Sequence, residues 1–328
     1  MDATPRIAQR IVVLDAFTMG QDVYWELIGD QGELVLYDRT EPRDVQERAR
    51  GAQVLFTNKT VLDAGTINAL PDLKCICVLA TGYNVVDIAA AAARGIPVCN
   101  VPGYSPPAVA QHVMAVTLEL FGKACRHAQA VAQGRWSAQP DFCFWDAPIT
   151  ELANKTFGIV GFGAIGRRVG ELAHAFGMNV LCHVPRPKEL PDYGPFAFAT
   201  LADLFEDSDV VSLHCPLTAE NENMVDAKLL SRMKPTAFLV NTARGPLVDE
   251  TALAAALTAG KLGGAALDVV REEPIRPDNP LLSAPNCLIT PHVAWASVEA
   301  RRRLMGIAAA NLRAFLAGSP QNVVNGVG

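Results

Sequence analysis

The glycine-rich segment at residues 161–166 constrains the fold of this chain more than any other feature. It reads Gly161-Phe162-Gly163-Ala164-Ile165-Gly166, directly follows the apolar run Phe157–Val160 and opens a helical stretch, Arg167–Phe176. In such a strand–turn–helix unit the first glycine permits a tight turn and the second lets a pyrophosphate approach the backbone. The third lets helix and strand pack closely. The segment therefore predicts a Rossmann-type unit that binds a dinucleotide at the helix N-terminus.

Short apolar runs bounded by Gly, Pro, Asp or Asn alternate with helical stretches along most of the chain. This alternation predicts parallel sheets covered by helices, an α/β fold. The strands expected in the first hundred residues are Ile11–Leu14, Glu33–Tyr37, Gln53–Thr57, Cys75–Leu79 and Pro97–Asn100, with helices at Pro42–Arg50, Asp63–Ala69 and Asp87–Arg94. A second series comprises Phe157–Val160, Asn179–His183, Val210–Leu213, Ala237–Asn241, Gly264–Asp268 and Cys287–Thr290.

At 328 residues the chain is long enough for two domains. The strongest break is the segment 102–107, which reads as a hinge because it is rich in proline and glycine and too short for a tether. We expect one long helix after it, Ala108–Gln133, and a last helix, Ser297–Leu316, that returns to the first domain. The expected domains are thus residues 1–102 with 296–328, for substrate, and residues 103–295, for the dinucleotide.

Charge and cysteine usage exclude several classes of partner. The net charge is −6 and only 19% of residues are charged, with lysine and arginine scattered along the chain. This balance argues against nucleic acid or an anionic membrane surface and favours small solutes. No signal peptide and no apolar stretch of roughly 18 residues is evident. The eight cysteines form no CxxC pair, so we expect buried thiols in a reducing cytoplasm and no metal site.

The end of the second strand of the dinucleotide domain bears on cofactor choice. An NAD-binding domain usually carries Asp or Glu there to bond the ribose hydroxyls. Here Val184 stands at that place and Arg186 follows. A guanidinium without a neighbouring carboxylate accommodates a 2′-phosphate, which favours NADP(H) over NAD(H). The alternative is that Arg186 is a solvated loop residue.

Three motifs follow the last three expected strands, where an open α/β sheet places its site. They are Asn241-Thr242-Ala243-Arg244-Gly245, Asp268 with Glu273-Pro274, and Thr290-Pro291-His292. Reduction of a 2-keto acid needs a cation for the carboxylate and carbonyl, a proton donor, and a group that keeps the donor charged. Arg244, His292 and Glu273 supply one each.

Together these motifs resemble the D-isomer-specific 2-hydroxyacid dehydrogenase family over nearly the whole chain. The resemblance implies a Rossmann cofactor domain inserted in a flavodoxin-like substrate domain. It implies that Arg244 orients the substrate and that His292 protonates the carbonyl oxygen as hydride reaches C2. Glu273 would hydrogen-bond His292, with Glu272 as the alternative partner, and Asp268 would meet the nicotinamide carboxamide.

The same resemblance assigns two further groups of residues. Backbone amides of Ala80, Thr81 and Gly82 would bind the substrate carboxylate, since exposed N–H groups in a turn suit an anion. The remaining cofactor contacts would come from His214, Cys215 and Pro216 after the third strand, from Thr242 and Ala243 after the fourth, and from His292 after the sixth. The other histidines, His112, His127, His174 and His183, are interpreted as structural, and Asn58 and Lys59 as possible cleft residues.

Within the family, four segments resemble glycerate dehydrogenases, also called hydroxypyruvate reductases: Thr57–Thr60, Ala80–Asp87, Asp141–Trp145 and His292–Ser297. Hydroxypyruvate and glyoxylate are the substrates this implies. Two alternatives remain open: oxidation of phosphite or formate by the same fold, and a non-catalytic NAD(H)-sensing regulator. The helix Ala108–Gln133 with the aromatic loop Phe142–Trp145 resembles the segment that builds a homodimer, and its apolar residues equally suit a domain core.

Overall fold

The computed structural model describes residues 9–186 and 188–327. The chain divides into two compact units: unit 1 is Met1–Ser105 with Ala296–Gly328, and unit 2 is Pro106–Trp295. The first division falls after Ser105 rather than after residue 102, because helix α5 (Pro106–Gly122) begins at the next residue.

Unit 1 contains a parallel sheet of five strands in the order β2-β1-β3-β4-β5, the flavodoxin-like arrangement. Its strands are β1 (Arg10–Val13), β2 (Glu33–Leu36), β3 (Val54–Thr57), β4 (Cys75–Val78) and β5 (Val98–Cys99). Its helices are η1 (Ala16–Met19), α1 (Glu26–Gly29), η2 (Pro42–Asp44), α2 (Val45–Arg48), α3 (Ala64–Asn68), α4 (Ile88–Ala93) and α11 (Val298–Leu316). All five strands were predicted, whereas η1 and α1 were not, and the expected helix 42–50 is split into η2 and α2.

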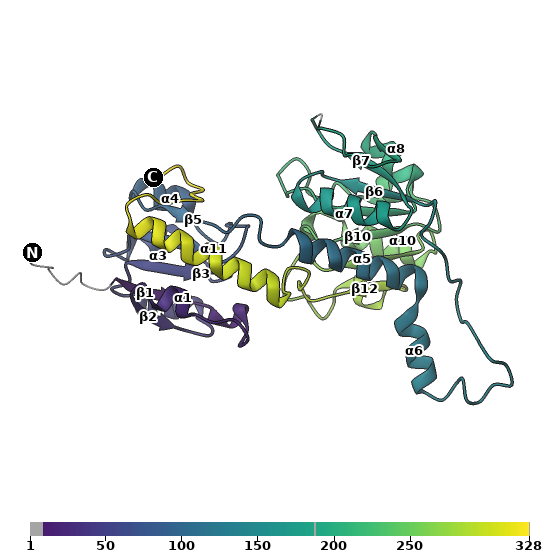
Figure 1. Ribbon diagram of the computed structural model, residues 1–328, viewed down its shortest axis with the longest axis horizontal. Coiled ribbons are helices and arrows are strands. Elements are labelled where there is room, and N and C mark those ends of the chain that lie inside the picture. Colours follow the sequence, from purple (N-terminus) through teal and green to yellow (C-terminus); the bar gives the residue numbers. More distant parts are fainter. Residues whose placement is uncertain (1–8, 187, 328) are drawn as a thin grey trace, which may run out of the picture. The chain divides into compact units, whose positions relative to one another are not determined.

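Both faces of the unit 1 sheet are buried. One face, with Val12, Leu55 and Ile76, packs against α2, α3 and α4. On the other, α11 packs along β4 and contacts α1, so the C-terminal helix returns to the first unit as predicted (Figure 1). Ser297 caps α11 by accepting a hydrogen bond from the backbone N–H of Ala300.

Unit 2 contains a parallel sheet of seven strands in the order β12-β11-β10-β9-β6-β7-β8. The strands are β6 (Thr156–Val160), β7 (Asn179–His183), β8 (Phe196–Phe198), β9 (Val210–Leu213), β10 (Phe238–Asn241), β11 (Gly264–Leu267) and β12 (Cys287–Ile289). The order reverses between β6 and β9, which is the doubly wound topology predicted from the sequence. Strand β8 was not predicted, because it is three residues long and its pattern is mostly exposed.

Helices cover both faces of this sheet, because successive strand residues point to opposite sides. Ile159 lies in the core formed with α5 and α7 (Ala164–Ala175), while its neighbour Val160 lies in the opposite core. That second core is formed with α8 (Leu201–Asp207), α9 (Ala227–Leu230) and α10 (Glu250–Thr258). Short 3₁₀ helices, η3 (Gly245–Leu247) and η4 (Pro280–Ser283), follow β10 and β11.

The single long helix expected over residues 108–133 is wrong. The structure has two helices, α5 and α6 (Ala124–Ala132), separated by Lys123 in the left-handed conformation with φ 53°. A left-handed residue ends a helix, because the hydrogen-bond ladder cannot continue through it. Figure 1 shows the result: α6 and the loop after it extend away from the sheet of unit 2. Within the described ranges, no helix is long and apolar enough to cross a membrane.

Candidate active site

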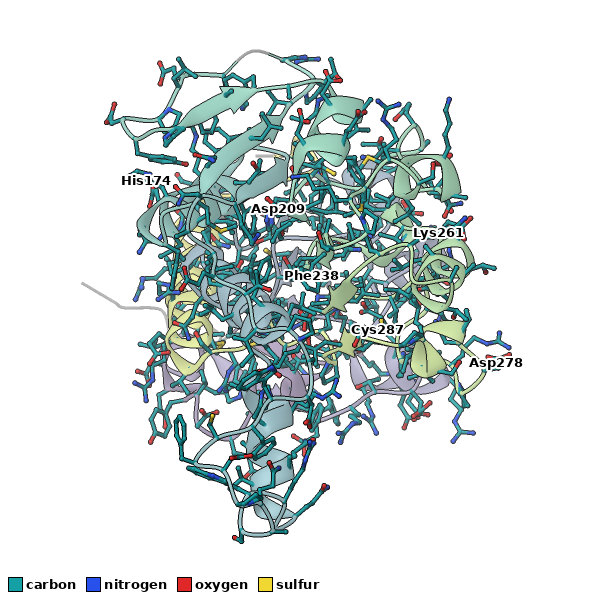
Figure 2. The ribbon with its side chains drawn as sticks, turned by 90° about the vertical axis from the view of Figure 1, so that its right-hand side faces the viewer. His174, Asp209, Phe238, Lys261, Asp278 and Cys287 are labelled. Carbon is teal, nitrogen blue, oxygen red and sulfur yellow. The ribbon has the colours of Figure 1, made fainter. Side chains whose placement is uncertain are left out.

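The three predicted catalytic side chains follow three neighbouring strands of unit 2. Arg244 follows β10, Glu273 follows β11 and His292 follows β12, and these strands are adjacent in the sheet. Their carboxyl ends therefore share one edge. Figure 2 looks onto the opposite edge, where Asp209, Phe238 and Cys287 mark the starts of β9, β10 and β12.

Glu273, and not Glu272, is the partner of His292. The Oε2 atom of Glu273 lies 2.7 Å from Nδ1 of His292, and Oε1 accepts a 3.3 Å hydrogen bond from the Val270 N–H. Glu272 instead lies 3.6 Å from the guanidinium of Arg276. No residue in the two described ranges hydrogen-bonds Nε2 of His292, so this nitrogen is available to a substrate oxygen. The pair fits the arrangement of a proton donor and the carboxylate that orients it.

Arg244 lies in a turn that the side chain of Asn241 stabilises with two hydrogen bonds. The buried Asn241 amide donates to the Arg244 carbonyl at 2.9 Å, and its Oδ1 accepts from the Ala243 N–H at 3.0 Å. A Cβ placed on Gly245 would lie 2.0 Å from the carbonyl carbon and oxygen of Val270. Only glycine thus lets the Arg244 turn pack against the segment that leads to Glu273.

The backbone of His292 is held by Asp268. His292 has φ 54°, a conformation that costs a non-glycine residue energy, and its N–H donates to the carbonyls of Asp268 (2.9 Å) and Thr290 (3.0 Å). The buried Asp268 carboxylate accepts from the Thr290 hydroxyl at 2.6 Å and from the N–H groups of Val293 and Ala294 at 2.9 and 2.8 Å. These three bonds leave one of about four acceptor positions. The sequence did not reveal that Asp268 anchors the loop that carries His292. The predicted contact between Asp268 and a nicotinamide carboxamide stays a prediction.

The glycine turn is tightly packed at Gly161 and Gly166 and open at Gly163. Gly161 has φ 98°, and a Cβ there would lie 2.8 Å from the His214 carbonyl and the Cys215 N–H nitrogen. A Cβ on Gly166 would lie 2.1 Å from the Gly161 oxygen, whereas one on Gly163 meets nothing within 4 Å. Gly163 is also the N-cap of α7, and no side chain caps that helix. Open space above uncapped N–H groups fits a bound phosphate.

Two further groups near this edge fit a dinucleotide. The His214 N–H donates to the Val160 carbonyl at 2.7 Å, which places residues 214–216 against the glycine turn. Burial lowers the pKa of His214 to about 3, so its ring is neutral at physiological pH, and Nε2 lies 2.9 Å from the Ser212 hydroxyl. The hydroxyl of Thr242 is buried and has no hydrogen-bond partner in the part of the chain that the structure describes. A buried polar atom in this state is suited to a ligand's hydrogen bond.

The residues expected to select the cofactor follow β7. Val184 is partly buried and packs against the α5/α7 core, while Arg186 is exposed. No acidic residue stands between β7 and Arg186. Among the described residues, no group of three His, Cys, Asp or Glu side chains is arranged to hold a metal ion.

The predicted substrate-binding turn, Ala80–Gly82, lies in unit 1 directly beyond β4. Its carbonyls are used internally: that of Ala80 accepts from the Val101 N–H at 3.0 Å, and that of Thr81 from the Asn100 amide at 2.8 Å. Its N–H groups have no acceptor within residues 9–186 and 188–327. The turn therefore offers donors to an anion, and its contact with a substrate carboxylate stays a prediction.

A doubly wound sheet with a glycine turn open at Gly163, and with an arginine and a Glu–His pair at adjacent strand ends, defines an oxidoreductase that uses a nicotinamide dinucleotide. The chain belongs to the D-isomer specific 2-hydroxyacid dehydrogenase family: the model of that family's NAD binding domain matches residues 114–294. The resemblance inferred from the motifs is thereby confirmed.

Relatives of known name agree with this assignment. The chain is 43% identical over 320 residues to a hydroxypyruvate reductase from Blautia hydrogenotrophica, covering 96% of this chain and 99% of the relative. It is 44% identical over 285 residues to a glycerate dehydrogenase from Methylorubrum extorquens, covering 86% and 88%. Among solved structures, the NADPH-dependent glyoxylate/hydroxypyruvate reductase from Sinorhizobium meliloti in complex with NADP and malonate superposes with a TM-score of 0.82 at 30% identity, covering 97% of both chains.

Proposed function

We propose that this enzyme reduces hydroxypyruvate and glyoxylate to D-glycerate and glycolate with NAD(P)H, and catalyses the reverse reaction. The observation that carries the proposal is the 2.7 Å contact between Glu273, which follows β11, and His292, which follows β12, in the same sheet as β10, which precedes Arg244. The names of the relatives support the substrate class. Arg244 binds the substrate carboxylate and polarises the carbonyl, and His292 gives the carbonyl oxygen a proton from Nε2. Glu273 holds the imidazole in orientation and favours its charged form.

The bound cofactor supplies a hydride to C2, and this chain's residues hold it in place. In the proposed arrangement the pyrophosphate lies on the turn Gly161–Gly166, with the amides of Ala164 and Ile165. Residues 214–216, Thr242, Ala243 and Asp268 contact the remainder of the dinucleotide. The backbone amides of Ala80, Thr81 and Gly82 bind the substrate carboxylate.

A panel of acids tests the proposal. We expect kcat/KM to be highest for hydroxypyruvate or glyoxylate among glyoxylate, hydroxypyruvate, pyruvate and phenylpyruvate. A bulky keto acid that wins by orders of magnitude would reject the substrate assignment. Inactivity on every keto acid, with turnover of phosphite or formate, would support the first alternative. Dinucleotide binding without any turnover would support the regulator.

We further propose that NADP(H) is preferred over NAD(H). The absence of an acid after β7 and the exposed guanidinium of Arg186 support this preference, as does the NADPH dependence named for the Sinorhizobium meliloti relative. Arg186→Gln is expected to lower the ratio of kcat/KM for NADPH to that for NADH by about tenfold, since a charge-assisted bond to a phosphate is lost. Lys188→Gln, in the same exposed loop, is the matched control. A clear preference of the unaltered enzyme for NADH would refute the proposal.

A homodimer and a cytoplasmic location complete the proposal. The extended segment after α5 exposes large apolar side chains, among them Phe142 (88%) and Trp145 (67%), which is unusual for a surface that stays in contact with water.

All eight cysteines are free, which suits a reducing compartment. Sedimentation equilibrium is expected to give twice the chain mass, and Phe142→Ser with Trp145→Ser to give the monomer. A monomeric unaltered protein would rule out the dimer, and activity confined to an extracellular fraction would rule out the location.

A further inference from the structure

Three side chains from three elements form a hydrogen-bonded chain behind the His292 loop. His112 lies on α5, Thr290 follows β12 and Asp268 follows β11. The Nε2 atom of His112 lies 3.2 Å from the Thr290 hydroxyl and 3.7 Å from Oδ1 of Asp268, and the hydroxyl lies 2.6 Å from the same Oδ1. All three residues belong to unit 2.

Counting donors fixes the direction of this chain. An ionised carboxylate only accepts hydrogen bonds, so the single proton of the Thr290 hydroxyl is donated to Asp268. The hydroxyl oxygen can then only accept from His112, which must carry its proton on Nε2. His112 therefore donates to Thr290, and Thr290 donates to Asp268.

Asp268 transmits this arrangement to the catalytic histidine. Its carboxylate holds the N–H groups of Val293 and Ala294, and its carbonyl accepts from the N–H of His292 itself. The left-handed backbone of His292 costs about 1–3 kcal/mol and persists only where its surroundings fix it. Any rotation of the Asp268 carboxylate thus displaces the loop that aims His292 at Glu273.

We infer that His112 is a positioning residue of the reaction: through Thr290 it fixes the Asp268 carboxylate and so the orientation of His292. The inference rests on the proposed function for its kinetic consequences. Its structural consequence, an ordered 290–294 loop, is independent of any substrate. The His112 side chain is 19% exposed, and its ring nitrogen contacts Thr290 and Asp268, which hold the His292 loop.

Replacement of His112 by leucine and by glutamine tests the inference. Leucine removes the donor, whereas glutamine carries an N–H donor at nearly the position of Nε2. We expect His112→Leu to lower kcat for hydroxypyruvate about tenfold, the loss of one buried hydrogen bond. KM for hydroxypyruvate should change less than about twofold, because Arg244 and the amides of residues 80–82, which are proposed to bind the substrate carboxylate, are unaltered. His112→Gln should stay within about threefold of the unaltered enzyme.

A double-mutant cycle separates positioning from packing. Thr290→Val replaces the relay hydroxyl with a methyl group and is expected to cost about the same factor, because it removes the same chain of hydrogen bonds. The double variant His112→Leu/Thr290→Val should lose little more than either single variant, because both act on one chain of hydrogen bonds. Multiplied losses, or equal losses for leucine and glutamine at position 112, would overturn the inference in favour of simple packing.

Hydrogen exchange gives a readout that needs no turnover. Deuterium uptake of the peptide containing Val293 and Ala294 should be faster in His112→Leu and Thr290→Val than in His112→Gln and the unaltered protein. His174→Leu is the control, since His174 lies on α7 and stacks on Tyr193, away from this loop. Unchanged exchange in His112→Leu would overturn the inference even in an active enzyme. Changed exchange in an enzyme inactive on every keto acid would leave it standing and reject the proposed function alone.

Discussion

Replacing His292 with alanine is expected to lower kcat for keto-acid reduction by about a thousandfold, within the range of general acid catalysis. In this variant, alanine at position 292 cannot give a proton to the substrate's carbonyl oxygen. Cofactor affinity should be nearly unchanged, because the glycine turn that is proposed to hold the pyrophosphate follows β6, whereas His292 follows β12. Stopped-flow measurement of hydride transfer gives the first quantity and fluorescence titration gives the second. A variant as active as the unaltered enzyme would show that the assigned proton transfer is wrong.

Glu273→Gln refines this expectation. The amide keeps the shape and can accept a hydrogen bond from Nδ1, but it no longer stabilises the charged imidazole, so a loss of about ten- to a hundredfold is expected. Glu272→Gln is the matched control, because the Glu272 carboxylate contacts Arg276 rather than His292. The double variant His292→Ala/Glu273→Gln should be no slower than His292→Ala. A further multiplied loss would mean that Glu273 acts independently of the histidine.

The sequence was sufficient to place the three predicted catalytic residues at one edge of the sheet, because parallel strands bring their carboxyl ends together. Arg244, Glu273 and His292 are separated by at most 48 residues of chain, and each follows a strand that was recognisable from its own apolar run. Once the strands were placed, the proximity of these residues followed. The choice between Glu272 and Glu273 did not follow from the strand pattern, since the two are adjacent. The family resemblance favoured Glu273, and the observed 2.7 Å contact with His292 agrees with it.

The features that escaped sequence reasoning depend on tertiary contacts or on very short elements. Strand β8 has three residues and an exposed pattern, so it carries almost no periodic signal. The break at Lys123 follows Gly122, a glycine that helices tolerate at a small cost, and a left-handed residue other than glycine or asparagine is not expected at position 123. His112 lies on an apolar helix, and its contact with Thr290 spans 178 residues. No local pattern encodes such a partner.

Alanine at Gly163 and alanine at Gly166 are expected to have different consequences, although the two glycines belong to one motif. A Cβ on Gly163 meets nothing within 4 Å, and the residue has φ −82°, which any residue adopts. Gly163→Ala should therefore leave the unliganded protein as stable as before, within about 0.5 kcal/mol. If the pyrophosphate lies on this turn, the added methyl occupies its place, and dinucleotide affinity should fall at least about tenfold.

Gly166→Ala should instead damage both the turn and the fold. Its Cβ would lie 2.1 Å from the Gly161 oxygen and 3.2 Å from Cγ2 of Ile159, so backbone must move. Overpacking of this kind costs about 1–3 kcal/mol, which corresponds to a Tm lowered by about 5 °C. Calorimetry with and without dinucleotide measures both effects. If Gly163→Ala kept full dinucleotide affinity, the pyrophosphate would bind elsewhere. If its Tm without ligand were lowered, the space at Gly163 would be filled by another part of unit 2.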